Sequence, residues 1–215
     1  MNKLTKFFVT LSFIVLCIQG VLMSAKAHKL QSPDVNWIGK AHNVGVEYVF
    51  THLSADDLVN PDQLEQVVAK LAEEYIKLSG VPDVVPAEIT KEGRVLLDRL
   101  FTLIDEEPPL AEFQRQLAEL EAETYESVNA EEATAIAGAI SVARYSGELW
   151  TPITEGGLSG WRYLPGQEGN DEQAEEKIDW GDVVKADVKG FLSSFFSIKK
   201  AIIASVIELI MQILF

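Results

Sequence analysis

The chain has 215 residues, 47% of them hydrophobic, and a formal net charge of −15 at pH 7. This apolar content is enough for a buried core and excludes an intrinsically disordered chain. The strong negative charge opposes contact with a phosphate backbone, so we do not expect nucleic acid as a partner.

Residues 1–27 have the features of a secretory signal peptide. Lys3 and Lys6 form a basic start, an apolar run follows, and a Ser-Ala-Lys-Ala sequence predicts cleavage before His28. A retained membrane anchor and, because of Cys17, a lipid-attached form are the alternative interpretations. Cleavage would remove the only cysteine, so we expect no disulfide and no thiol chemistry afterwards. We expect export through the Sec pathway to the periplasm, the cell envelope or the medium.

Five amphipathic helices are predicted between residues 28 and 150. Apolar residues recur at helical spacing in each of them, and prolines or capping side chains mark several of the starts. The predicted helices cover approximately residues 32–53, 60–79, 87–105, 108–128 and 130–150. Their short connections favour an α-helical bundle. The last of them contains the small-residue run AIAGAISVA, so we expect it to be the central, closely packed helix.

The chain changes in character twice after residue 150. Residues 151–177 are rich first in glycine and then in acidic residues, which predicts a loop or short hairpin followed by a linker. Residues 178–215 contain no proline and are apolar around most of a helical wheel, which predicts one long C-terminal hydrophobic helix. The expected fold is therefore all-α, with a helical bundle over residues 28–150, a linker and a hydrophobic tail.

A narrow stripe of small and polar residues runs along the predicted tail helix. Small residues four positions apart let two helix backbones approach closely, so we predict that this stripe is a helix-contact face. Its members, called the small-residue stripe below, are Gly190, Ser194, Ser197, Ala201, Ser205, Glu208 and Gln212.

The apolar surface of the predicted tail helix must be buried against other apolar groups. Residues 201–215 would extend about 22 Å as a helix, whereas a bilayer core is ~30 Å thick, so a single membrane span is disfavoured. The other interpretations are burial in the chain's own core or in a dimer, and an interfacial or conditionally inserting helix. The expected partners are therefore a membrane surface or a partner helix, bound through residues 186–215, or a second copy of the chain.

Residue types that carry chemistry are present, but not at catalytic spacings. His42 and His52 lie ten positions apart on the first predicted helix, so they do not share a helical face, and neither belongs to an HExxH motif. Adjacent acidic residues point about 100° apart on a helix and are typical of solvated faces. The glycine-rich run at 156–160 fits neither a phosphate-binding loop nor a G-x-S-x-G turn. We therefore predict no catalytic residue, no metal site and no cofactor.

Residues 38–49 read IGKAHNVGVEYV. They resemble a G-x-x-H-N-x-G-hydrophobic-x-Tyr segment of exported helical proteins, mainly of Bacteroidetes. Those proteins often end in a hydrophobic, small-residue-rich segment after an Asp-Val pair, as at Asp187-Val188 here. The tail departs from that pattern because large residues replace most of the glycines, and the resemblance implies no activity. Within the segment, His42 and Asn43 are a candidate polar binding pair or, alternatively, a surface pair or a buried hydrogen-bonding pair.

These observations favour a non-enzymatic exported helical protein whose C-terminal helix associates with a membrane or a partner helix. In a second hypothesis, the protein is a soluble helical homodimer with the tail as its core helix. In a third, the linker is cleaved and the tail is released as a hydrophobic peptide. A hydrolase that uses His42 with a nearby acid is the least favoured, because no nucleophile–base spacing is present.

Overall fold

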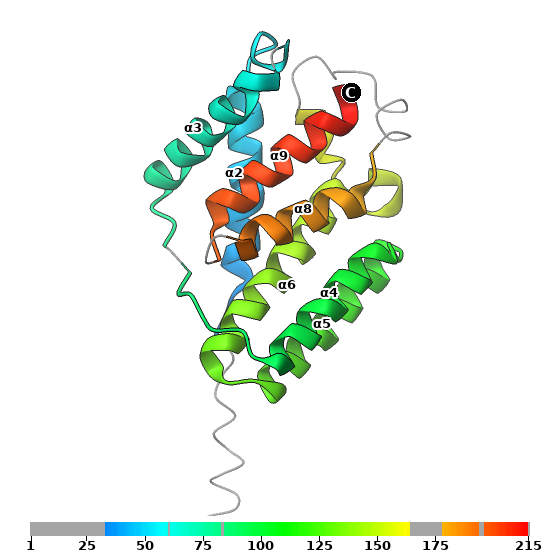
Figure 1. Ribbon diagram of the computed structural model, residues 1–215. Helices are drawn as coiled ribbons and strands as arrows, with labels where there is room; N and C mark the ends of the chain where they lie inside the picture. The colour runs from blue at the N-terminus through cyan, green and yellow to red at the C-terminus, as the bar shows by residue number, and fades with distance from the viewer. Residues whose placement is uncertain (1–32, 60, 83, 164–177, 194–195, 215) are drawn as a thin grey trace, which may run out of the picture. The chain divides into compact units, whose positions relative to one another are not determined.

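The computed structural model describes residues 33–59, 61–82, 84–163, 178–193 and 196–214. Within these residues the protein is all-helical, with seven α-helices and no strand (Figure 1), which confirms the predicted all-α class. The α-helices are α2 (Asn36–His52), α3 (Pro61–Ser79), α4 (Lys91–Asp105), α5 (Leu110–Ser127), α6 (Ala130–Trp150), α8 (Trp180–Ser193) and α9 (Ile198–Leu214). Three short 3₁₀ helices are η1 (Asp57–Val59), η2 (Ile153–Glu155) and η3 (Gly160–Tyr163). The predicted signal peptide and residues 164–177 of the predicted linker lie outside the described residues.

Local sequence signals explain where several helices begin. Thr90 is the N-cap of α4, and its side-chain oxygen accepts a hydrogen bond from the backbone N–H of Gly93 (3.2 Å). Asn129 caps α6 in the same way, by accepting from the N–H groups of Glu131 and Glu132. Such caps satisfy donors that the first turn of a helix leaves unpaired. The five helices predicted in the first part of the chain are present as α2 to α6, with ends that differ by a few residues.

The central helix is α6, as its small side chains predict. It packs against α2, α4, α5 and α8, and residues around its whole circumference are buried. Gly39 of α2 lies so close that a Cβ atom there would be 2.3 Å from the backbone oxygen of Ser141. The N–H of Gly39 also donates a hydrogen bond to the Ser141 hydroxyl (3.1 Å). Small residues on both helices thus bring the backbones of α2 and α6 into contact.

The prediction of one long helix over residues 178–215 is wrong, because the tail forms the two helices α8 and α9 (Figure 1). Phe196 adopts a left-handed backbone conformation (φ +64°), which a continuing α-helix does not allow. The N–H of Ser197 donates a hydrogen bond to the carbonyl of Phe191 (2.9 Å) and closes the end of α8. The Ser197 carbonyl then accepts from the N–H of Ala201 (3.1 Å), which begins α9. We call α8 and α9 together the tail hairpin.

The tail hairpin lies in the core of the molecule. Its two helices pack on each other, α8 also packs on α6, and α9 packs on α2 and α3. Apolar side chains on both helices are completely buried, namely Val183, Val184, Val188, Phe191, Ala201, Ile202, Val206, Leu209 and Ile210. Residues from Asp34 onward accordingly form one compact unit that includes the tail. A bundle complete without the tail is therefore not confirmed, and the chain's own helices cover most of the tail's apolar surface.

The glycine-rich part of the predicted linker is expected to be either a loop or a short hairpin. Over residues 151–163 the chain forms the turns η2 and η3, so a β-hairpin in this part is wrong. Gly156 has φ +93°, a conformation that glycine adopts without strain, and it ends η2.

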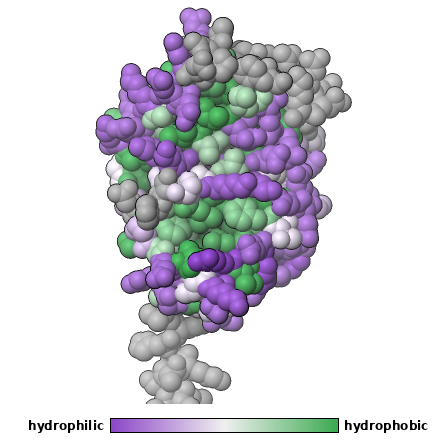
Figure 2. Space-filling model, viewed as in Figure 1, coloured by the Kyte–Doolittle hydropathy of each residue, from purple (hydrophilic) through white to green (hydrophobic). Residues whose placement is uncertain are grey.

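The surface retains some apolar area near the tail hairpin. On the face seen in Figure 1, hydrophobic side chains gather along the middle, where α9, α8 and α6 lie, between more hydrophilic margins (Figure 2). On α9, Ile203 and Ile207 are half-exposed and Met211 is 44% exposed. In the described part of the chain, no helix combines the length and the apolar content that crossing a membrane requires.

Candidate functional site

The small-residue stripe makes contacts within the tail hairpin. At Gly190 of α8, an added Cβ would lie 2.6 Å from the backbone oxygen of Lys200, so the two backbones of the hairpin meet there. Ala201 and Ser205 of α9 are fully buried. Gln212 accepts a hydrogen bond from the N–H of Asp179 at the start of α8 (3.0 Å). These residues therefore make their contacts between α8 and α9.

The other members of the stripe lie nearer the surface. Glu208 is half-buried and accepts a hydrogen bond from the side-chain amide of Gln212 (3.2 Å). Ser197 is half-buried at the start of α9, where its hydroxyl accepts from the N–H of Lys200 (3.4 Å). Ser194 lies outside the described residues. The small-residue stripe therefore does not form one contact face: some members lie between α8 and α9, and the others lie nearer the surface.

The candidate pair His42 and Asn43 connects α2 with the centre of the molecule. His42 is fully buried, and its Nδ1 lies 3.1 Å from Oδ1 of Asn43. The amide of Asn43 donates a hydrogen bond to the backbone oxygen of Tyr145 on α6 (2.7 Å). On its other side, Nε2 of His42 lies 3.6 Å from Oδ2 of Asp187 on α8. Both residues therefore hold helices together; His42 is closed to a ligand in this conformation, whereas Asn43 is half-buried.

Asp187 lies at the centre of a buried polar cluster that four helices share. The cluster consists of His42 (α2), Ser146 and Trp150 (α6), Asp187 (α8) and Ser205 (α9), all of them fully buried. The Ser146 hydroxyl and the Trp150 indole N–H (3.3 Å) both donate to Oδ2 of Asp187. Three members, His42, Asp187 and Ser205, stand in patterns that the sequence shows, but those patterns do not connect them, because His42 is far from the other two in the chain.

Burial sets the electrostatics of this cluster. Loss of contact with water raises the pKa of Asp187 to about 6, against the opposing effects of His42, Ser146, Ser205 and Trp150. Although the Ser205 hydroxyl influences the carboxyl group, neither its Oγ nor Oδ1 of Asp187 is at hydrogen-bonding geometry to any partner, and the same holds for Nε2 of His42. A buried polar atom without a partner costs roughly 1–3 kcal/mol. The cluster therefore ties the helices together at some expense of stability.

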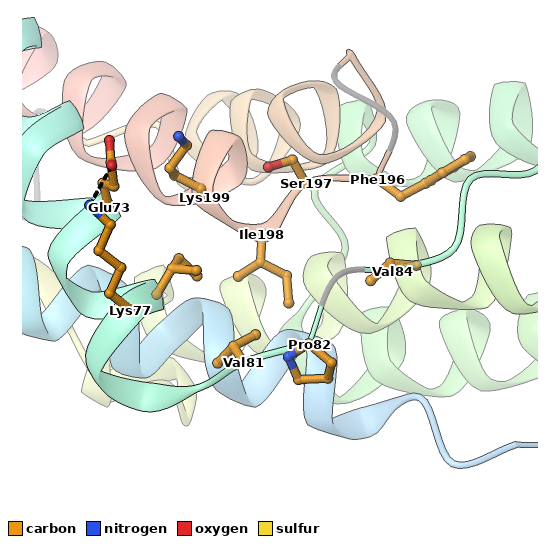
Figure 3. A pocket seen from close by; sticks show the side chains of 10 residues that line it. Glu73, Lys77, Val81, Pro82, Val84, Phe196, Ser197, Ile198 and Lys199 are labelled. Atoms are coloured by element: carbon orange, nitrogen blue, oxygen red, sulfur yellow. Dashed lines mark ion pairs between the residues drawn. The ribbon is translucent and has the colours of Figure 1, made fainter.

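A second candidate site is a surface groove that is open to solvent. It lies between α3, the connector after it (residues 80–90) and the start of α9 (Figure 3). One hollow of about 320 Å³ has an apolar floor and is lined by Glu73, Ile76, Lys77, Val81, Pro82, Val84, Phe196, Ser197, Ile198 and Lys199. In Figure 3 the side chain of Ile198 projects from α9 toward Val81 and Pro82 of the connector. Phe196 and Ile198 are only 5% and 4% exposed, so the floor belongs to the hydrophobic core.

An adjoining hollow of about 640 Å³ continues along α3 and α9, and most of its lining residues carry charged or polar head groups on apolar stems. It is lined by Gln66, Ala69, Lys70, Glu73, Glu74, Lys77, Lys199, Lys200 and Ile203. The two hollows share Glu73, Lys77 and Lys199, and together they are called the lysine groove below. The groove thus combines an apolar part and a part rich in lysine.

The lysine groove carries positive charge in a chain whose formal net charge is −15. Lys77 pairs with Glu73 (2.7 Å), and this contact lowers the pKa of the Glu73 carboxyl, as does the nearby charge of Lys199. Within the described residues, Lys70, Lys199 and Lys200 form no ion pair. The first residues of α9 also line the groove, and the start of a helix has a partial positive charge.

Sequence analysis did not find the lysine groove. Lys199 and Lys200 interrupt the apolar wheel of the tail, which was a usable signal, but Lys70 and Lys77 look like ordinary residues of a solvated helix face. Only the packing of α3 against α9 brings the two pairs of lysines to one place.

No protein-family model, curated protein or solved structure matches this chain. The function therefore has to be inferred from the two sites themselves. The buried polar cluster is closed to ligands in this conformation, whereas the lysine groove is open. We take the lysine groove as the candidate binding site.

Proposed function

We propose that this chain is a non-enzymatic, exported binding protein that takes a negatively charged ligand at the lysine groove. The observation that carries the proposal is the meeting of Lys70, Lys199 and Lys200, all without an ion pair in the described residues, at one groove of an acidic chain. On α5, by contrast, Arg115 pairs with both Glu112 and Glu119.

Unpaired lysines beside a hollow favour anions for a simple electrostatic reason. The larger hollow is lined by four lysines and two glutamates, so it carries a net positive charge, and an anion placed among the lysines gains attraction to each. The start of α9 adds the positive end of its helix dipole. The many acidic residues of the remaining surface repel the same ligand, which would direct it to this groove.

The proposal changes the role first expected for residues 186–215. That segment still supplies the binding surface, but through Lys199 and Lys200 at the start of α9. Most of its apolar side chains pack against the chain's own helices. Association with a membrane or a partner helix through the apolar face of the tail would require the tail hairpin to leave the core.

Charge reversal tests the proposal directly. In the variant Lys199→Glu/Lys200→Glu we expect affinity for octyl phosphate, measured by isothermal titration calorimetry, to fall roughly tenfold or more, because two attractions of up to ~1 kcal/mol each become repulsions. Acidic residues are favourable in the first turn of a helix, so the variant should fold as well as the parent.

Two controls make the result specific. Lys189→Glu reverses the charge of an exposed lysine on α8 that does not line the groove, and it should leave the affinity nearly unchanged. Octylammonium has the same chain with the opposite charge and should bind more weakly than octyl phosphate. Equal affinities for parent and Lys199→Glu/Lys200→Glu would refute the proposed function.

A further inference from the structure

We infer that the ligand of the lysine groove is a single-chain anionic amphiphile, such as a fatty acid or a monoalkyl phosphate, whose head group lies on the lysines and whose chain lies on the apolar floor. This inference rests on the proposed function, because it specifies the ligand of the same groove.

The apolar floor argues against a purely ionic ligand. Ile76, Val81, Val84, Phe196 and Ile198 line the smaller hollow, and they come from α3, the connector and α9. Apolar surface that water touches is unfavourable until another apolar group covers it. Ile76 and Val81 are half-buried, so their part of the floor meets water. An inorganic anion would leave that part wet, whereas an alkyl chain would cover it.

The position of two lysines fits the head group of such a ligand. Lys77, its ion-pair partner Glu73 and Lys199 line both hollows, so a net positive charge lies where the apolar part and the lysine-rich part meet. Lys199 is half-buried, which is typical of a lysine whose stem lies along apolar surface and whose ammonium group reaches water. A ligand with one charged end and one apolar end would satisfy both parts of the groove at once.

The size and form of the groove favour a ligand with a single alkyl chain over a membrane surface. A hollow of about 320 Å³ lies at the lower end of the ~300–1,000 Å³ that small-molecule pockets occupy. Its apolar residues line a recess between α3 and α9, and two of them, Phe196 and Ile198, are almost completely buried. Binding to a membrane surface would instead use the exposed face of α9, where Ile203, Ile207 and Met211 lie, and would leave the recess empty.

The inference predicts how affinity depends on chain length. For a series of monoalkyl phosphates from butyl to decyl, all kept monomeric, we expect affinity to rise by up to about fourfold for each added methylene group until the floor is covered. Isothermal titration calorimetry of the full-length protein measures the affinity for each member of this series. Inorganic phosphate should bind more weakly than any member.

A matched pair of variants tests where the alkyl group of the ligand binds. Val81→Trp puts a large side chain at the edge of the apolar floor and should reduce affinity for decyl phosphate roughly tenfold, while affinity for inorganic phosphate stays the same. Val85→Trp introduces the same side chain four residues later, where Val85 is 75% exposed and does not line the groove, and should have no effect. Thermal melting checks that both variants fold.

The outcomes separate this inference from the proposed function. If butyl and decyl phosphate bind equally well while Lys199→Glu/Lys200→Glu still weakens binding, the inference is overturned and anion binding stands. If the protein binds vesicles of anionic phospholipid but no monomeric alkyl phosphate, the occupant is a membrane surface and the inference is again overturned. An increase with chain length that Val81→Trp abolishes and Val85→Trp preserves would support it.

Discussion

Nε2 of His42 lies 3.6 Å from Oδ2 of Asp187, and both side chains are completely buried. The pair joins α2, near the beginning of the described chain, to α8 in the tail hairpin. Ser146 and Trp150 of α6 bind the same carboxyl oxygen, so three helices meet at one side chain. The arrangement gives the tail hairpin a specific position on helices that apolar packing alone would hold less selectively.

Removing the carboxyl group of Asp187 should destabilise the fold strongly. At about pH 4, where the folded chain keeps this carboxyl group protonated, we expect Asp187→Ala to lower the free energy of unfolding, measured with denaturant, by about 3 kcal/mol, because Ser146 and Trp150 lose their common partner. Asp187→Asn keeps an oxygen that can accept from Ser146, so it should lose less. An Asp187→Ala variant as stable as the parent would contradict the role given to this cluster.

The raised pKa of Asp187 predicts a dependence of stability on pH. The folded chain holds the proton of this carboxyl up to a pH of about 6, whereas the unfolded chain releases it near 3.8. The contribution of Asp187 to stability is therefore fully present below about pH 3.8 and is lost as the pH rises through 6. The difference in unfolding free energy between parent and Asp187→Asn should become less favourable to the parent over this range. A difference that is constant from pH 4 to 7 would contradict the prediction.

Glu107, at the end of α4, should contribute a second pH dependence of the same sign. Although Glu107 is exposed as a whole, desolvation of its carboxyl group and the neighbouring carboxylates of Asp179, Asp182 and Asp105 raise its pKa to about 7 from 4.5. Its contribution is present below about pH 4.5 and is lost as the pH rises through 7. Glu107→Gln should therefore gain stability relative to the parent between pH 5 and 8. Melting temperatures of the two proteins across this range measure the effect, and parallel curves would count against it.

Gly190 should tolerate no larger residue where α8 meets α9. A Cβ atom at this position would lie 2.6 Å from the Lys200 backbone oxygen and 2.9 Å from Cβ of Ala204, so the helices would have to separate. We expect Gly190→Ala to lower the unfolding free energy by roughly 1–3 kcal/mol, even though alanine favours helices more than glycine does. Lys189→Ala, next to it on the exposed side of α8, should be nearly neutral. Stabilisation by Gly190→Ala would show that the hairpin is looser than described.

Deleting residues 186–215 distinguishes the tail hairpin from a peripheral tail. The deletion would remove Phe191, Ile202 and Val206 from the core and expose apolar faces of α2, α3 and α6. We expect the shortened chain to lose its cooperative thermal transition in near-ultraviolet circular dichroism. A shortened chain that melts as sharply as the parent would instead favour a bundle that is complete without the tail.

The lysine groove could not be predicted from the sequence. Each lysine on α3 and α9 has a local explanation as part of a solvated helix face or the start of a helix. Their common function depends on which faces of the two helices turn toward each other. That choice depends on packing between residues more than a hundred positions apart in the chain, which leaves no periodic signal in either segment.

The sequence by itself determined the helices of the first part of the chain and the central place of α6. These follow from local causes, namely apolar residues at helical spacing, prolines, the caps Thr90 and Asn129, and side chains small enough for close packing. Only the tertiary structure decided the break at Phe196, because the apolar pattern of the tail runs through that position unchanged. It also decided the meeting of His42 with Asp187 and of the lysines on α3 with those on α9. The physical reason is that neighbouring residues set a helix, whereas contacts between distant residues depend on how whole helices pack.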